Sequence, residues 1–130
     1  MKKTSITIGI ILIFILGAFI WMTGSAKKEL DTMVYEDIDM NLVSDGTYYG
    51  ETDAGLVLVK VGVYVEEHTI SDIDLIEHQN GLGSKAEAIT ELMIQKNSYD
   101  VDAISGATLS SEAIKSAVSK ALKEGYTEQP

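Results

Sequence analysis

A short segment of small residues that ends in a threonine is the part of the chain best suited to bind a ligand. Its members are Asp102, Ala103, Ile104, Ser105, Gly106, Ala107 and Thr108. Apolar residues then recur at helical spacing, so we expect Thr108 on a tight turn at the start of a helix, with Ser110 and Ser111 at its N-cap. Unpaired N–H groups and a positive helix dipole at such a turn suit a phosphate. Gly106 lets a ligand approach the backbone closely, and Ala107 adds little bulk.

The spacing alone is typical of an ordinary loop before a surface helix, but the residue types are more specific. Asp102 to Thr108 resembles the D-x-x-S-G-A-T signature of the FMN-binding domain family. This family includes the flavin-carrying subunits of the Rnf and sodium-pumping NADH:quinone reductase complexes, and small membrane-attached flavoproteins. Its final signature threonine can carry FMN through a phosphoester bond. The resemblance, which extends from about Asp45 to Leu122, implies FMN as the cofactor and Thr108 as its attachment point.

Further residues of this chain are predicted to contact the cofactor. They are Asp102, Ser105, Gly106, Ala107 and Ser110 around the threonine, and His78, Gly81 and Gly83 in an earlier segment. Asp102 orients Thr108, helps to position a metal used by the modifying enzyme, or caps the turn. Gly81 and Gly83 allow a flat ring to approach the backbone, although the Thr-Pro that relatives commonly have before this Gly-x-Gly is missing here. His78 touches the flavin or caps a strand end, and the residues alone favour the second alternative.

Composition excludes several functional classes. The chain of 130 residues has no cysteine, so it forms neither disulfides nor thiolate metal sites. All 20 acidic residues follow Lys28. Residues from Lys27 onward contain these 20 acids and 8 lysines, which gives this part of the chain a net charge of −12. Such a domain repels nucleic acid. His68 and His78 lack the spacing of helical metal ligands, and Thr108 has no nearby histidine to act as its base.

Residues 1–26 predict a membrane anchor or a signal segment. Lys2 and Lys3 precede residues 6–22, an apolar run near the lower limit of about 17 residues for a span, and the anchor is the preferred interpretation. Both interpretations place the acidic domain outside the cytoplasm. Residues 27–44 are expected to form a helix or stalk, and residues 45–130 the FMN-binding domain.

The domain pattern predicts an α+β fold, in which helices pack on a small antiparallel sheet. Strands are expected over residues 46–51, 56–65 and 70–76, with alternate valines of the second strand on one face. Residues 66–69 form the hairpin turn between the second and third strands. Ser84 and Glu87 have the residue types and spacing of a capping box, which predicts a helix that ends near Asn97.

These observations predict a membrane-anchored, extracytoplasmic electron-transfer flavoprotein that carries FMN on Thr108. The flavin supplies the redox chemistry, and the protein supplies attachment and orientation. Its expected partners are a flavin transferase, membrane redox proteins and the lipid bilayer, and it is more an electron carrier than a stand-alone enzyme. The alternatives are non-covalent FMN binding by the same fold, and an anchored adaptor that has lost its flavin.

Overall fold

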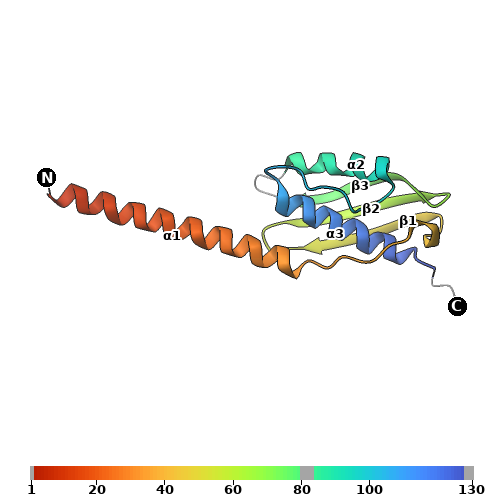
Figure 1. Ribbon diagram of the computed structural model, residues 1–130, viewed down its shortest axis with the longest axis horizontal. Coiled ribbons are helices and arrows are strands. Elements are labelled where there is room, and N and C mark those ends of the chain that lie inside the picture. Colours follow the sequence, from red (N-terminus) through yellow and green to blue (C-terminus); the bar gives the residue numbers. More distant parts are fainter. Residues whose placement is uncertain (1, 80–83, 128–130) are drawn as a thin grey trace.

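A long helix leads into a three-stranded sheet that is packed against further helices (Figure 1). The structure, a computed structural model, describes residues 2–79 and 84–127. In chain order the elements are α1 (Lys2–Thr32), the 3-10 helix η1 (Met40–Leu42), β1 (Gly46–Asp53), β2 (Leu58–Glu66), β3 (Thr69–Gln79), the 3-10 helix η2 (Ser84–Ala88), α2 (Ile89–Lys96) and α3 (Thr108–Glu124). The predicted α+β class, a small antiparallel sheet with packed helices, is confirmed.

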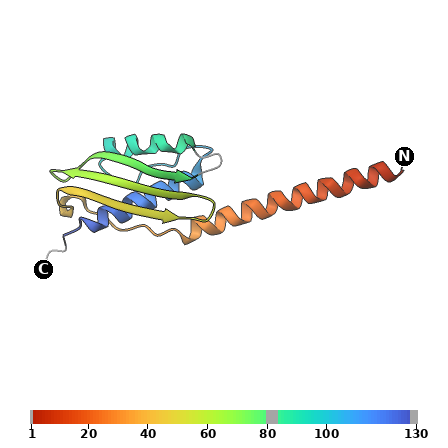
Figure 2. The ribbon, with the colours of Figure 1, turned by 180° about the vertical axis from the view of Figure 1, so that it is seen from behind.

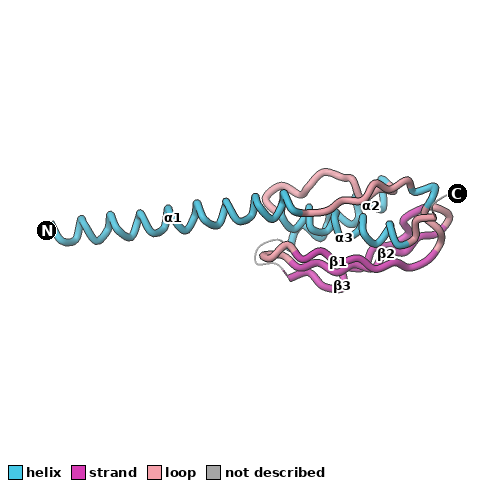
Figure 3. Tube along the Cα trace, turned by 90° about the horizontal axis from the view of Figure 1, so that it is seen from below, coloured by secondary structure: helices cyan, strands magenta, loops and turns pink. Residues whose placement is uncertain are grey.

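The sheet is antiparallel with strand order β1-β2-β3, and its two faces differ in chemistry. Val59, Val61, Val63 and Val65 are at most 2% exposed, because residues two apart in a strand share a face and this face meets the helices. Figure 3 shows the helices gathered on one side of the sheet, and Figure 2 shows the strands from the other side. The predicted valine face of the second strand is therefore confirmed.

β3 departs from strict alternation, and a register shift explains why. Ile70 and Ile73 are both buried although they are three positions apart, an odd spacing that places residues of a regular strand on opposite faces. Val65 pairs with Ile70 while Tyr64 pairs with Asp72, so one extra residue is accommodated in β3 between these pairs. Such a bulge returns the following side chains to the helix-facing side of the sheet.

The hairpin between β2 and β3 uses two residues in the left-handed region. Glu67 and His68 have φ values of 51° and 61°, and the flanking residues Glu66 and Thr69 are paired. A two-residue hairpin turn with two positive φ angles matches the twist of the strands but is normally built from Asn and Gly. Backbone and side-chain hydrogen bonds hold this turn: Asp45 Oδ1 accepts from the Glu67 N–H at 2.8 Å, and His68 Nδ1 lies 2.9 Å from the Val43 carbonyl oxygen.

Glu67→Asn should stabilise the domain by about 0.5–1 kcal/mol, because asparagine tolerates a positive φ better than glutamate. The backbone hydrogen bond to Asp45 does not depend on the Glu67 side chain and is retained. Urea unfolding would measure the gain. Glu66→Asn is the matched control, since it removes the same charge one residue earlier in β2, where asparagine is disfavoured. An equal gain in both variants would attribute the effect to charge instead of backbone strain.

The backbone of α3 packs unusually close to the backbone of β1. A Cβ built on Gly50 of β1 would lie 2.0 Å from the Ala117 carbonyl oxygen and 2.9 Å from the Ala121 nitrogen. The helix face in contact with the sheet is rich in small residues, and Ala113, Ala117 and Ala121 are fully buried. Backbone therefore packs on backbone, which fixes the position of α3 relative to β1.

Residues 33–39, named the strap here, run from α1 along α3. The Ser116 hydroxyl donates to the Val34 carbonyl at 2.5 Å, and the Ser119 hydroxyl accepts from the Glu36 N–H at 3.2 Å. Both serines are fully buried, so these contacts replace hydrogen bonds that water would otherwise make. The predicted stalk of residues 27–44 thus consists of the end of α1 and a segment held against the domain. No helix among the described residues meets the length and hydropathy that a membrane span requires.

Candidate functional site

The segment before α3 forms a tight turn that depends on its glycine. The Ala107 N–H donates to the Ile104 carbonyl at 3.0 Å, and Gly106 has a φ of +79°. A positive φ at the third of four turn residues defines a type II turn, which requires glycine there. Ser111, fully buried in α3, accepts a 2.9 Å hydrogen bond from the Ile104 N–H and ties the turn to the helix.

The predicted N-cap at Ser110 and Ser111 is wrong. α3 begins at Thr108, its N-cap residue is Ala107, and both serines lie inside the first turns. Ser110 is 3% exposed, so its side chain faces the domain interior. The reason is the preceding turn: Gly106 already directs the chain into the helix, and the Ser111 hydroxyl is used by the backbone of the turn instead of by the helix start.

The start of α3 offers hydrogen-bond donors next to an exposed hydroxyl. Ala107 provides no side-chain cap, and Thr108 is exposed at the first helical position. The first N–H groups of an α-helix have no intrahelical acceptor, and the helix dipole is positive there. The residues therefore fit the phosphate of FMN: an acceptor hydroxyl, uncapped N–H groups, and a glycine without a Cβ.

Lys85 of η2 adds a positive charge to this turn. A Cβ built on Gly106 would lie 3.1 Å from Lys85 Nζ and 3.7 Å from its Cε, so the ammonium group lies beside the bare Cα of the glycine. Lys85 could not be recognised as part of this site from the sequence, because it lies 21 positions before Gly106 and no local motif links the two. The balance of lysines against acids marked it only as one of the eight lysines from Lys27 onward.

His78 lies at the end of β3 and is linked to the same element as Lys85. Its Nδ1 is 3.1 Å from Glu87 Oε1, and its side chain is 3% exposed. Because η2 carries both Lys85 and Glu87, it joins the end of β3 to the turn before α3. The other predicted contacts of this region, Gly81 and Gly83, lie outside the described residues.

The Asp102 side chain takes no part in the hydrogen bonds of the Gly106 turn. It is exposed and borders a hollow of about 430 Å³ that it shares with Leu92, Gln95, Lys96 and Val101. Within the described part of the chain, no hydrogen bond or ion pair engages its carboxylate. The structure thus brings Ser105, Gly106, Ala107 and Thr108 together at one turn, where Ser105, Gly106 and Thr108 are exposed and Ala107 is buried. Ser110 is buried in the first turn of α3, and Asp102 is exposed on the loop before the turn.

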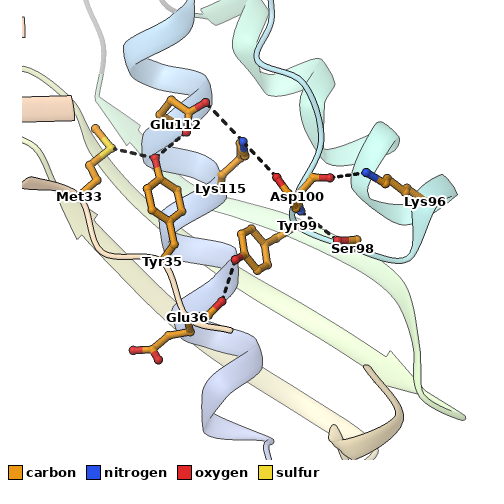
Figure 4. Close-up of polar contacts among 9 residues, drawn as sticks. All are labelled: Met33, Tyr35, Glu36, Lys96, Ser98, Tyr99, Asp100, Glu112 and Lys115. Carbon is orange, nitrogen blue, oxygen red and sulfur yellow. Dashed lines mark hydrogen bonds and ion pairs between the residues drawn. The ribbon is translucent and has the colours of Figure 1, made fainter. Parts of the chain in front are cut away.

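A polar network, shown in Figure 4, connects the strap to α3 one turn after Thr108. The Tyr35 hydroxyl donates to Glu112 Oε2 at 2.5 Å, and Lys115 bridges Glu112 and Asp100 at 3.4 and 3.7 Å. Burial, followed by the hydrogen bond and charge of Glu112, raises the pKa of Tyr35 above its ordinary value, so its hydroxyl remains a donor.

Tyr99, in the loop after α2, stacks on another tyrosine of the protein. Its ring lies 6.4 Å from that of Tyr35 at an interplanar angle of 16°, and its hydroxyl donates to the Glu36 carbonyl at 2.7 Å. The pair joins the strap to the loop before the Gly106 turn. The network holds the end of α1 close to the start of α3.

Comparisons with known proteins identify the family of this domain. The family model described as the FMN-binding domain matches residues 54–123, which include the Gly106 turn and most of α3. The crystal structure of the CPE2226 protein from Clostridium perfringens is similar, with 25% sequence identity and a TM-score of 0.53, over 64% of this chain and 88% of that one. No curated protein matches the chain. The chain belongs to the FMN-binding domain family, and FMN is its cofactor.

Proposed function

We propose that the protein is an electron carrier whose FMN is attached to Thr108 by a phosphoester. The observation that carries the proposal is the Gly106 turn, which presents the threonine of the D-x-x-S-G-A-T segment as an exposed hydroxyl beside uncapped N–H groups. The flavin supplies reversible oxidation and reduction when bound, and the chain supplies its attachment and orientation.

Attachment is a group transfer without a change of oxidation state. Thr108 Oγ forms a bond to the flavin-side phosphorus of FAD, the diphosphate P–O bond breaks, AMP leaves, and the hydroxyl proton is released. None of the described residues offers a base in hydrogen-bond contact with Thr108, so the catalyst in this proposal is a separate flavin transferase. Thr108 is the acceptor of the modification.

Covalent attachment suits a domain that faces a dilute medium. A dissociation constant of about 1 μM corresponds to about −8.2 kcal/mol, and such a site stays mostly empty when free flavin is far below that concentration. A phosphoester retains the flavin regardless of dilution. It also carries a single negative charge, against about −1.5 to −2 for a phosphate monoester, which reduces repulsion by the acidic domain.

We place the domain outside the cytoplasm, held to the membrane by residues 6–22. Large apolar side chains of α1 from Ile6 to Trp21 are 49–76% exposed, and they surround the helix instead of forming one stripe. A helix that is apolar on all sides needs an apolar environment. Tyr35 lies three residues after α1 and donates to Glu112, which lies four residues after Thr108. The Gly106 turn is therefore at the end of the domain from which α1 departs (Figure 1). This arrangement favours redox partners at the membrane.

The anchor can be tested by membrane extraction and protease accessibility. The full chain should remain in membranes washed at alkaline pH, and a variant lacking residues 1–26 should be released. Protease added outside intact cells should digest the acidic domain and leave the N-terminus protected. A mature protein that starts near Lys27 would support a cleaved signal instead, and a domain digested only after lysis would contradict the extracytoplasmic placement.

Flavin attachment is tested by producing the chain together with a flavin transferase. The protein should gain the mass of one FMN phosphoester and fluoresce in a denaturing gel. A yellow protein that loses its flavin on denaturation would indicate non-covalent binding. A colourless protein would indicate an adaptor without flavin.

A further inference from the structure

We infer that Lys85 is the residue that holds the flavin phosphate at Thr108 by charge, as a positioning residue for attachment. The inference rests on the proposed function, because it assigns the cation of the same site. Two observations carry it: the location of the ammonium group beside Gly106, and the engagement of the other domain lysines elsewhere.

The first observation is geometric. Lys85 Nζ would lie 3.1 Å from a Cβ at Gly106, so the absence of a side chain at this position leaves room for the ammonium group against the turn. Thr108 follows two residues later, at the start of α3. A phosphate on Thr108 Oγ is therefore close to two sources of positive potential, the uncapped N–H groups and Lys85.

The second observation is that the remaining lysines of the described domain are engaged in other contacts. Lys60 pairs with Glu77, Lys96 donates to the Asp100 carbonyl, Lys115 pairs with Glu112 and Asp100, Lys120 donates to Glu51 and Thr52, and Lys123 lies over the Tyr126 ring. Among the described residues, none forms a hydrogen bond or an ion pair with Lys85. An unpaired cation beside the attachment residue, in a chain whose residues from Lys27 onward carry a net charge of −12, is suited to one anionic ligand.

The charges also match in number. A phosphodiester between Thr108 and the flavin carries one negative charge, and one ammonium group neutralises it. Lysine is a flexible point charge, so it can follow the phosphate from the incoming FAD to the finished ester. The contact is charge-assisted, which makes attachment sensitive to salt.

The test measures the initial rate of flavin attachment by a purified transferase with FAD, using mass spectrometry. Lys85→Gln should slow attachment about tenfold, the size expected for loss of one charge-assisted hydrogen bond. Lys85→Arg should restore most of the rate. Added salt should slow the parent protein more than Lys85→Gln. Lys123→Gln is the matched control, because it removes the same charge at the far end of α3 and should leave the rate unchanged.

A second measurement separates this inference from the proposed function. Unmodified protein is titrated with inorganic phosphate while the amide signals of Gly106, Ala107 and Thr108 are followed by NMR. The parent and Lys85→Arg should show saturating shifts, and Lys85→Gln should lose them while keeping its thermal unfolding temperature.

The outcomes decide the two proposals independently. If the parent gains covalent flavin and Lys85→Gln does so equally fast, the Lys85 inference is wrong and the proposed function stands. If the parent never gains covalent flavin, the proposed attachment fails and the phosphate titration decides the role of Lys85. Absence of a Lys85-dependent shift in that titration would overturn the inference.

Discussion

Thr108→Ala is expected to abolish covalent flavin completely while the domain remains folded. Thr108 is exposed, its hydroxyl is the proposed acceptor, and no described residue depends on its side chain for a hydrogen bond. The change in the free energy of unfolding should stay within about 0.5 kcal/mol, as for most exposed positions. After production with a flavin transferase, the variant should show the mass of the unmodified chain and no fluorescence in a denaturing gel.

A conservative variant at the same position and a variant of a neighbouring hydroxyl provide the controls for this experiment. Thr108→Ser keeps the acceptor oxygen and should still be modified, at a lower rate because the hydroxyl is less restricted in its rotamer. Ser105→Ala removes an exposed hydroxyl from the same turn and should still gain one flavin. Flavin that survives denaturation in Thr108→Ala would assign attachment to another residue.

Gly50→Ala adds one methyl group and is expected to lower the free energy of unfolding of the domain by about 3 kcal/mol. The added Cβ would lie 2.0 Å from the Ala117 carbonyl oxygen, and backbone of α3 cannot rotate away as a side chain can. α3 must therefore shift from β1, and the turn that carries Thr108 moves with it. Urea unfolding would measure the loss, and attachment of flavin should slow in the same variant.

Gly62→Ala is the matched control on the neighbouring strand. Its Cβ would meet the exposed Tyr49 ring at 3.3 Å, and that side chain can give way. The expected loss is below about 1 kcal/mol. If the two alanine variants were equally destabilised, strand propensity would explain both results and the close approach of α3 would not.

The local features of this domain were readable in the sequence because each depends on neighbouring residues. Alternate valines define the buried face of β2, since strand geometry repeats every two residues. The small residues around Gly106 indicated a tight turn, and the predicted helix end near Asn97 is confirmed, since Asn97 is the C-cap of α2 with a φ of 53°. The D-x-x-S-G-A-T segment is likewise contiguous, so the family could be identified from it.

The helix start at Thr108 shows where local pattern misleads. Ser110 and Ser111 have the residue type of an N-cap, and they stand just before the apolar residues at helical spacing. Their burial decides the matter, because α3 packs on the sheet through this face and the Ser111 hydroxyl is needed by Ile104. Burial against a distant strand cannot be deduced from a cap preference.

The sequence by itself determined the three strands, the tight turn before α3 and the choice of Thr108 as the candidate attachment residue. Only the tertiary structure decided which distant groups come together near the start of α3 and the end of β3: Lys85 beside Gly106, Tyr35 on Glu112, and Glu87 beside His78. These contacts join residues 9 to 77 positions apart. They depend on the packing of η2, the strap and α3 around one sheet. Backbone periodicity depends on neighbouring residues in the sequence, whereas the electrostatic field at a binding site depends on the charged groups that the folded chain places near it.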